Sequence, residues 1–293
     1  MRKRITTGFA SGAALIAVLI STVVLDAQNE RIRAAWNRPQ KPFRIFGNTY
    51  WVGTYSLGSV LITSNAGHIL IDAALPESVP QIRDHIRELG FKVVDIKLIL
   101  NTHVHYDHAG GIAELQRLSG ARVAASAASA AVLKTGSAEP DDPQYGSLDS
   151  FEPVPSVQVV RNGETLSVGP LHLTAHMTPG HTAGGTSWSW RSCEGSLCLS
   201  VVYADSLSPV SNDTFKYTTS PLLKQFEKSY TTLENLPCDI LLTPHTGFSP
   251  ILENLAAREA GNTNAFVDRR ACKTYVGTWR ANLTQRINAE RGK

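Results

Sequence analysis

The sequence predicts an α/β protein of four layers, αββα, in which two β-sheets pack face to face and helices cover both outer faces. Two observations support this fold class. Short strand-like runs dominate both halves of the chain, and each half also contains segments with helical periodicity. A sheet that buries one face against a second sheet and the other face under helices leaves little apolar surface in water.

The first half of the chain begins with a predicted meander. Strands are expected at residues 43–46, 49–52, 59–63 and 68–72. Short turns containing glycine and asparagine separate these runs. Residues 79–89 repeat apolar side chains with a helical period. A strand at 96–100 and a helix at 112–118 follow, so this half ends in a βαβα alternation.

The second half repeats this scheme. Strands are expected at residues 157–160, 171–177, 186–190 and 199–203. A helix at 221–236 leads to a strand at 240–242, and a last helix runs from about 265 to 287. The polar turns after the strands are then expected to meet along one edge of the two-sheet sandwich.

The first 27 residues have the composition of a secretory signal peptide. Arg2, Lys3 and Arg4 form a basic start, and an apolar stretch follows at 10–25. We expect cleavage after Ala27 and export to the periplasm, which leaves residues 28–293 as a single domain. An uncleaved membrane anchor is the alternative, although the stretch is short for a spanning helix.

The charge of the expected mature chain argues against a nucleic-acid partner. The whole sequence has a formal charge of +3, and the expected leader carries three of the cations and one acid, Asp26. The remaining domain is therefore close to neutral, with a charge of +1, and offers no basic surface for a polyanion. We expect a monomer that acts on a small molecule and has no contact with the membrane after signal cleavage.

Four cysteines in an exported chain predict two disulfides, for which three connectivities exist. Cys193 and Cys198 flank the tip of a predicted hairpin, so we expect them to pair across the turn. The remaining pair, Cys238 and Cys272, would join the last strand to the C-terminal helix.

Residues 102–108, Thr-His-Val-His-Tyr-Asp-His, place four metal-binding side chains in six residues. They follow the predicted strand 96–100 and precede a pair of glycines. His103 and His105 alternate to the same side of an extended chain, so they can share one ion. Asp107 and His108 lie in the turn and can bind a second ion. The spacing favours two ions over one.

Two further histidines occur in the same local context. His181 lies in a Thr-Pro-Gly-His turn after the predicted strand 171–177, and His245 lies in a Thr-Pro-His turn after the strand 240–242. Three such turns after three strands support one another as a single metal site. The other histidines are expected to be structural or surface residues. His68 opens a strand, His85 lies on a charged helix face, and His172 and His176 alternate along one face of a strand.

The order of these motifs resembles that of the metallo-β-lactamase superfamily. His-x-His-x-Asp-His is followed by Pro-Gly-His, then by Asp205-Ser206, then by a late strand ending at His245. The early run 69–73, Ile-Leu-Ile-Asp-Ala, is similar to the first motif of that family. Within the superfamily the chain looks most like the subclass B3 β-lactamases, given the adjacent Asp107 and His108, the segment 204–208, the leader and the late cysteine pair. The resemblance covers residues 40–275 and implies the metallo-β-lactamase fold.

The resemblance implies two zinc ions per chain. His103, His105 and His181 would bind the first ion. The second would be bound by Asp107, His108 and His245. Three neutral imidazoles leave one tetrahedral position open, which is the pattern of a catalytic zinc. Imidazole and carboxylate ligands do not exclude iron, manganese or cobalt, so the identity of the metal depends partly on the resemblance.

The expected reaction is hydrolysis of a β-lactam amide bond by a metal-bound hydroxide, which would give resistance to penicillins, cephalosporins and carbapenems. Metal binding lowers the pKa of water from far above neutrality to about 7. Asp107 would be catalytic, as ligand and as the acceptor that orients the hydroxide. By resemblance, Ser206 and Ser208 would bind the substrate carboxylate, and Gln144 would add a contact from a loop over the site. Trp36 and Tyr55 can line the mouth of the site or pack in the core.

Two other functions remain open from sequence. A glyoxalase II-like thioesterase or a lactonase uses a bridging aspartate after the fourth strand, close to the position of Asp205. The sequence does not decide whether Asp205 or Ser206 faces the metals. A non-catalytic zinc-binding protein of the envelope is a third possibility, against which the open coordination positions argue. The preference among β-lactam classes is not readable from the sequence.

Overall fold

The first sheet begins as a meander and ends as a parallel sheet. The structure, a computed structural model, describes residues 29–292. Seven strands of this part of the chain form the first sheet in the order of the sequence. They are β1 (Phe43–Phe46), β2 (Thr49–Trp51), β3 (Val60–Ile62), β4 (His68–Ile71), β5 (Ile96–Leu100), β6 (Arg122–Ala125) and β7 (Val157–Val159). The first four pair antiparallel, and β4 to β7 pair parallel.

The second sheet has five strands within the described residues, in the order β12-β11-β10-β9-β8. They are β8 (Thr165–Val168), β9 (Leu171–Met177), β10 (Thr186–Glu194), β11 (Leu197–Tyr203) and β12 (Ile240–Leu242). All pairs are antiparallel except β11 with β12. The carboxyl ends of β9, β11 and β12 therefore lie at the same edge of this sheet.

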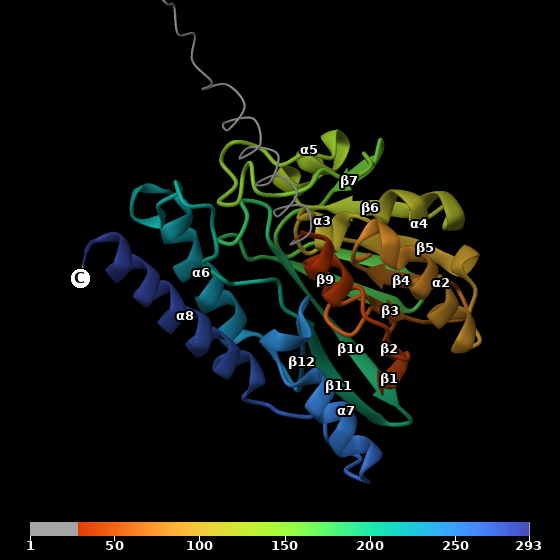
Figure 1. The fold of residues 1–293 in the computed structure, drawn as a ribbon. Helices are drawn as coiled ribbons and strands as arrows, with labels where there is room; N and C mark the ends of the chain where they lie inside the picture. Colours follow the sequence, from red (N-terminus) through yellow and green to blue (C-terminus); the bar gives the residue numbers. More distant parts are fainter. Residues whose placement is uncertain (1–28, 293) are drawn as a thin grey trace, which may run out of the picture.

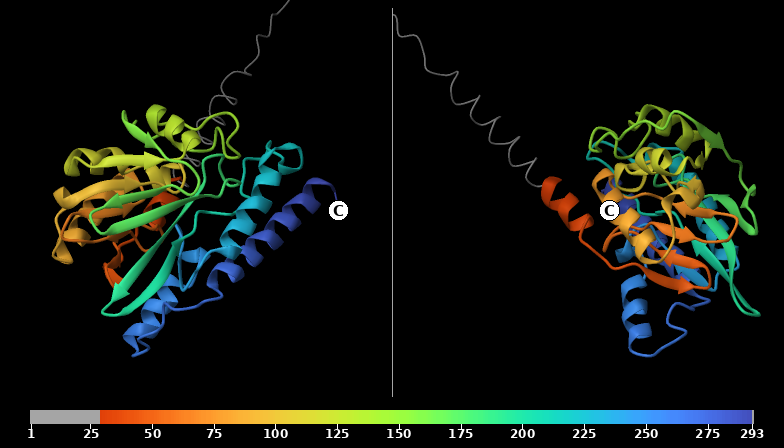
Figure 2. Two further views of the ribbon diagram at one scale, coloured as in Figure 1. Left: turned by 180° about the vertical axis from the view of Figure 1, so that it is seen from behind. Right: turned by 90° about the vertical axis from the view of Figure 1, so that its right-hand side faces the viewer.

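Helices cover the outer face of each sheet (Figures 1 and 2). The helices are α2 (Val79–Glu88), α3 (Tyr106–Ala109), α4 (Ile112–Ser119), α5 (Ala127–Thr135), α6 (Leu222–Asn235), α7 (Ile251–Glu259) and α8 (Ala271–Glu290). Short 3-10 turns are η1 (Pro76–Ser78), η2 (Val93–Asp95), η3 (Tyr217–Thr219) and η4 (Thr246–Phe248). Residues 29–36 are also helical. The predicted four-layer α/β fold is thus confirmed.

Side chains that alternate between the two faces of a strand explain how the layers pack together. Ile69 and Ile71 of β4 enter the core between the two sheets, whereas Leu70 between them faces the helices of the first sheet. In β12, Ile240 enters the same central core, and Leu241 packs toward α6 and α8. Because successive side chains of a strand point to opposite faces, β4 and β12 each contribute to two hydrophobic cores. Burial of a side chain of this size contributes roughly 1.5–3 kcal/mol.

Several details differ from the sequence-based expectations. Strand β6 and helix α5 complete another parallel unit in a segment for which no element was expected. The run 157–160 was assigned to the second half of the chain, but β7 is the edge strand of the first sheet. The short strand β8 and the helix α7 were also missed. The last helix begins at Ala271 and not near 265, because residues 263–270 form turns that connect α7 to α8.

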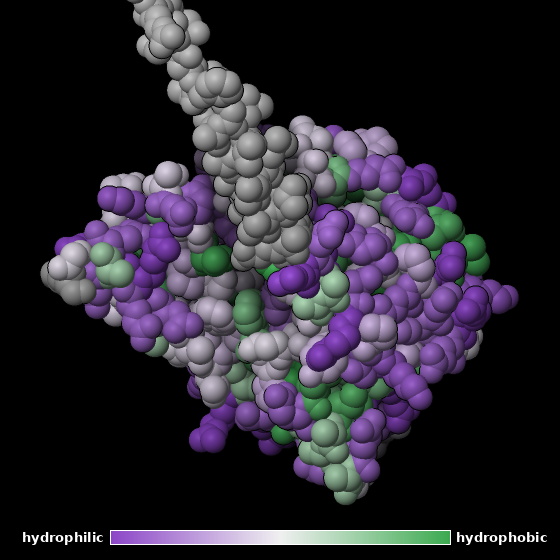
Figure 3. Space-filling model, in the orientation of Figure 1, coloured by the Kyte–Doolittle hydropathy of each residue, from purple (hydrophilic) through white to green (hydrophobic). Residues whose placement is uncertain are grey.

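Both expected disulfides are present in the structure, Cys193–Cys198 across the β10–β11 turn and Cys238–Cys272 between the segment that precedes β12 and the start of α8. The expected signal peptide, residues 1–27, lies outside the described residues. Within residues 29–292, no helix has both the length and the apolar character needed to cross a membrane. Hydrophilic residues dominate the face shown in Figure 3, with hydrophobic residues in scattered groups.

Candidate metal centre and active site

A buried carboxylate anchors the loop that follows β5. Oδ1 of Asp72 accepts a hydrogen bond from the Thr102 backbone N–H at 2.8 Å, and Oδ2 accepts one from the Thr102 hydroxyl at 2.7 Å. Burial raises the pKa of Asp72 to about 7, against the effect of these hydrogen bonds. Asp72 lies directly after β4, the neighbour of β5, so it supports the loop from behind.

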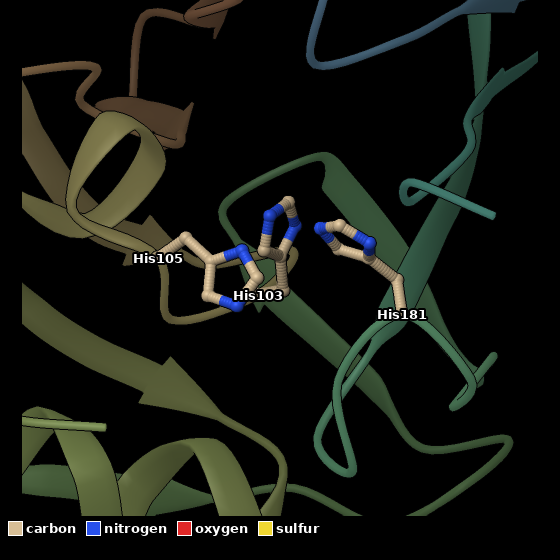
Figure 4. A group of neighbouring side chains, drawn as sticks. All are labelled: His103, His105 and His181. Carbon is tan, nitrogen blue, oxygen red and sulfur yellow. The ribbon is translucent and has the colours of Figure 1, made fainter. Parts of the chain in front are cut away.

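The first group of candidate ligands consists of His103, His105 and His181. One nitrogen of each ring lies within 4.8 Å of the others, and all three side chains are buried. Figure 4 shows the rings converging on a common point from two separate parts of the chain. The sequence motif predicted this grouping for His103 and His105, and the repeated strand–turn pattern predicted the third member.

The turn that carries His181 requires a glycine. Gly180 has a φ of 153°, in the region that L side chains rarely adopt. A Cβ atom at this position would lie 2.6 Å from the ring of Phe226 on α6. The Pro-Gly-His sequence therefore lets the chain pass close to α6 and return His181 toward the site.

Hydrogen bonds fix the orientation of His103 and His181. Nδ1 of His103 lies 2.7 Å from Oδ1 of Asp205, and Nδ1 of His181 lies 2.9 Å from the backbone oxygen of Ser208. Since a carbonyl oxygen only accepts, Nδ1 of His181 is the donor and Nε2 keeps its lone pair. Among the described residues, Nε2 of His103 is buried without a hydrogen-bond partner. Partners of this kind typically orient histidines that bind metals.

The second group consists of Asp107, His108 and His245. Oδ2 of Asp107 lies 3.2 Å from Nε2 of His108 and 3.3 Å from Nε2 of His245, and the two nitrogens are 3.0 Å apart. Two ligand atoms of a tetrahedral zinc, each about 2.0–2.1 Å from the ion, lie about 3.3 Å apart. This triangle of donor atoms therefore fits one zinc ion, and both triads match the sets expected from the sequence.

The electrostatics of the site favour neutral imidazoles beside one anion. Burial and the neighbouring imidazoles lower the pKa of His103 well below its ordinary value and that of His181 to about 3. Burial opposes ionisation of Asp107, but His108 and His245 outweigh it and hold the pKa of the carboxyl well below its ordinary value. Neutral imidazole and ionised carboxylate are the forms that bind divalent metals.

A cavity of about 540 Å³ opens over both groups of ligands. Its volume is in the range of small-molecule sites. Apart from the six candidate ligands, its lining is mostly apolar and aromatic, with a few polar groups. These lining residues are Trp36, Gln144, Leu148, Ser206, Ser208, Pro209, Val210, Phe248, Trp279 and Asn282.

The structure places the expected substrate contacts in this cavity. Gln144, Ser206 and Ser208 all line it. Asp205 is fully buried and has one carboxylate oxygen against His103, on the ring edge opposite Nε2. Ser206 therefore faces the cavity, and Asp205 lies behind a candidate ligand.

Sequence reasoning left some residues of the site unassigned. Phe248 and Trp279 form an aromatic wall with ring centroids 4.7 Å apart, and Phe248 packs against His245. Trp36 also lines the cavity, whereas Tyr55 stacks under the Arg38 guanidinium at 3.3 Å. A periodicity signal places such aromatics on a helix but cannot show which cavity they face.

His85 also differs from its sequence-based interpretation. It was expected on a charged helix face, but it is buried, with Nδ1 2.9 Å from the backbone oxygen of Val52. The hydrogen bond to the sheet explains its burial. His68, His172 and His176 likewise lie outside both ligand groups, as expected.

Comparison with known proteins identifies the family. Residues 58–194 match the family model of the metallo-β-lactamase superfamily. The Rm3 metallo-β-lactamase is 50% identical, with a TM-score of 0.87 over 89% of this chain and 98% of that protein. The chain belongs to the metallo-β-lactamase superfamily. MEM-A1, a subclass B3 metallo-β-lactamase from a soil metagenome library, is 47% identical, with a TM-score of 0.86 over 88% of this chain and 99% of that one.

Curated relatives of the chain include hydroxyacylglutathione hydrolases. The hydroxyacylglutathione hydrolase of Bradyrhizobium sp. (strain ORS 278) is 26% identical over 62% of this chain and 62% of its own length. That of Methylobacterium nodulans is 36% identical over 37% of this chain and 33% of its own length. The chain thus spans less than two thirds of these curated relatives. The predicted superfamily and the likeness to subclass B3 are confirmed.

Proposed function

We propose that this enzyme hydrolyses the amide bond of β-lactam antibiotics, including penicillins, cephalosporins and carbapenems, and thereby confers resistance. The observation that carries the proposal is the position of Ser206 in the cavity while Asp205 is held against His103. A thioesterase or lactonase of this superfamily would be expected to use an aspartate between the metals. The likeness to the Rm3 and MEM-A1 β-lactamases over almost their full length supports the same choice.

The two groups of donors fit zinc, and we propose two ions per chain. His103, His105 and His181 would hold one ion, and Asp107, His108 and His245 the other. Two bound zinc ions would supply Lewis acidity, which ionises water near neutral pH and polarises a carbonyl group. The imidazole and carboxylate donors and the likeness to the family support zinc as the metal.

The residues of the chain orient the substrate and the attacking water. The hydroxyls of Ser206 and Ser208 are suited to bind the substrate carboxylate, and the Gln144 amide can donate from the opposite loop. Asp107, held ionised, can accept a hydrogen bond from the attacking water and align its lone pair with the carbonyl carbon. Holding the reactants in this geometry lowers the entropic cost of the reaction.

The apolar part of the cavity has a separate role. Trp36, Phe248 and Trp279 offer aromatic surface for the variable side chains of a β-lactam and exclude water from the reacting groups. Such packing determines which substrates bind tightly and leaves the chemistry unchanged. We also propose that residues 28–293 act as a monomeric domain in the periplasm after cleavage of residues 1–27.

A carbapenem hydrolysis assay tests the proposal. The zinc-loaded protein should open the β-lactam ring, EDTA should abolish this activity, and added zinc should restore it. Clavulanate-type inhibitors, which trap serine nucleophiles, should have no effect. Expression in a susceptible strain should raise its tolerance of the same antibiotic.

The hydroxyacylglutathione hydrolases among the relatives favour a second candidate, hydrolysis of a glutathione thioester. The same preparation should therefore be offered a glutathione thioester and a lactone. Faster turnover of either one than of every β-lactam would overturn the proposal. Binding of zinc without hydrolysis of any of these substrates would favour a zinc-binding envelope protein.

A further inference from the structure

Asp142 is a buried carboxylate beside the first group of ligands. It lies in the loop between α5 and β7, and 8% of it is exposed. Its Oδ2 and Oδ1 lie 3.1 and 3.3 Å from Nε2 of His105. Oδ1 also accepts a hydrogen bond from the backbone N–H of Gln144 at 2.8 Å. One carboxylate therefore contacts both a candidate metal ligand and the loop that carries a candidate substrate contact.

The contact with Asp142 determines which nitrogen of His105 can bind a metal. An ionised carboxylate only accepts hydrogen bonds, so Nε2 of His105 carries the proton and Nδ1 keeps its lone pair. The amide nitrogen of Gln144 lies 3.2 Å from Nδ1 and donates to it, which agrees with the same tautomer. His105 therefore differs from His181, whose Nδ1 is the protonated nitrogen.

The loop around Asp142 is also joined to the opposite wall of the cavity. The backbone N–H of Asn212 donates to the oxygen of Pro143 at 2.8 Å, and its side-chain amide donates to the oxygen of Tyr145 at 2.8 Å. Asn212 follows the segment that contains Ser206 and Ser208. The hydrogen bonds of Asp142 and Asn212 thus hold the loop from two sides, and only those of Asp142 reach a metal ligand.

We propose that Asp142 is a positioning residue that fixes the tautomer and ring orientation of His105 and links the first metal position to the loop bearing Gln144. The inference rests on the proposed function, because it assumes that His105 binds a metal and that Gln144 contacts the substrate. It predicts that loss of Asp142 affects metal affinity and substrate affinity together.

The metal side of the link is measured in a His245→Ala background, which weakens the second position and isolates the first. Competition with a chromophoric zinc chelator gives the affinity. Asp142→Ala should weaken zinc binding by 10- to 100-fold, the usual effect of losing the partner of a metal-binding histidine. Asp142→Asn, which keeps an acceptor oxygen, should recover part of this loss. The matched control is Asp141→Asn, because Asp141 is the exposed neighbour.

The substrate side is measured at saturating zinc with the second position intact. Asp142→Ala and Gln144→Ala should each raise KM for a carbapenem more than they lower kcat. The double variant should raise KM no further than the larger single effect, because both substitutions remove the same contact. Additive effects on KM would overturn the link to the loop.

The outcomes separate this inference from the proposed function. Unchanged zinc affinity in both Asp142 variants, with a wild type that binds two zinc ions and opens β-lactams, overturns the inference alone. A wild type that binds zinc but hydrolyses only thioesters overturns the proposed function, while weaker zinc binding by Asp142→Asn would still support the role toward His105. If Asp142→Ala fails to fold, Asp142→Asn, which preserves the volume of the side chain, gives the same decision.

Discussion

Asp205 offers the sharpest distinction between the two candidate reactions. We predict that Asp205→Asn weakens zinc binding at the first metal position and leaves the second position intact. The carboxylate contacts His103 at 2.7 Å, and both side chains are almost fully buried. Loss of the hydrogen-bond partner of a metal-binding histidine typically lowers metal affinity by about 10- to 100-fold. Asparagine keeps an acceptor oxygen, so we expect about 10-fold.

The assay is a competition titration with a chromophoric chelator, which gives stepwise affinities for two ions. The control is Ser206→Ala, at the adjacent residue that faces the cavity. This control should leave both zinc affinities unchanged and raise KM for a carbapenem. If Asp205→Asn weakens both positions together, Asp205 bridges the metals, and the preference for a β-lactam over a thioester loses its support. Unchanged affinity at both positions would contradict the role of Asp205 behind His103.

Further predictions concern the ligands, acid stability and the longer disulfide. His181→Ala should leave one zinc ion per chain by metal analysis and no detectable β-lactam hydrolysis; full activity with one ion would contradict the assignment. Glu290 accepts hydrogen bonds from Arg286 and from the backbone of Tyr217 and Thr218. Burial raises the pKa of Glu290, but these contacts outweigh it and lower the pKa to about 2. Glu290→Gln should therefore lower the free energy of unfolding by about 2 kcal/mol above pH 4.5. The difference from wild type should vanish as the pH falls toward 2, and a difference independent of pH would refute the carboxylate's role. Replacing Cys238 and Cys272, which are 34 residues apart, by alanine should lower the stability by roughly 3–4 kcal/mol in urea titrations; no change would show that the crosslink does not restrict the unfolded chain.

The hydrophobic pattern of the sequence predicts most of the fold. The strands β4 and β12 are short continuous apolar runs because both of their faces are buried, and such runs are recognisable without knowledge of their neighbours. The hydrophobic pattern does not reveal which strands pair with one another. Strand β7 was assigned to the wrong half because a three-residue strand at a sheet edge contains no information about its partner. Residues 122–135 were missed because the alanine-rich run gives a weak periodic signal.

The six candidate ligands are recognisable because each follows a strand in a short polar turn. Asp142 has no such signal, since an aspartate in a loop usually caps a turn, and its contact with His105 depends on the path of 136–151. Phe248 and Trp279 line the cavity only because the fold brings η4 and α8 into contact beside the metal site. Contacts between distant segments require the fold, whereas clusters within one turn are visible in the sequence.

Metal analysis of three purified proteins tests the two-ion site most directly. We predict two zinc ions per chain in the wild type. His181→Ala should retain one ion, bound through Asp107, His108 and His245. His245→Ala should also retain one ion, bound through His103, His105 and His181. Two ions in either variant, or one in the wild type at saturating zinc, would contradict the proposed pair of metal positions.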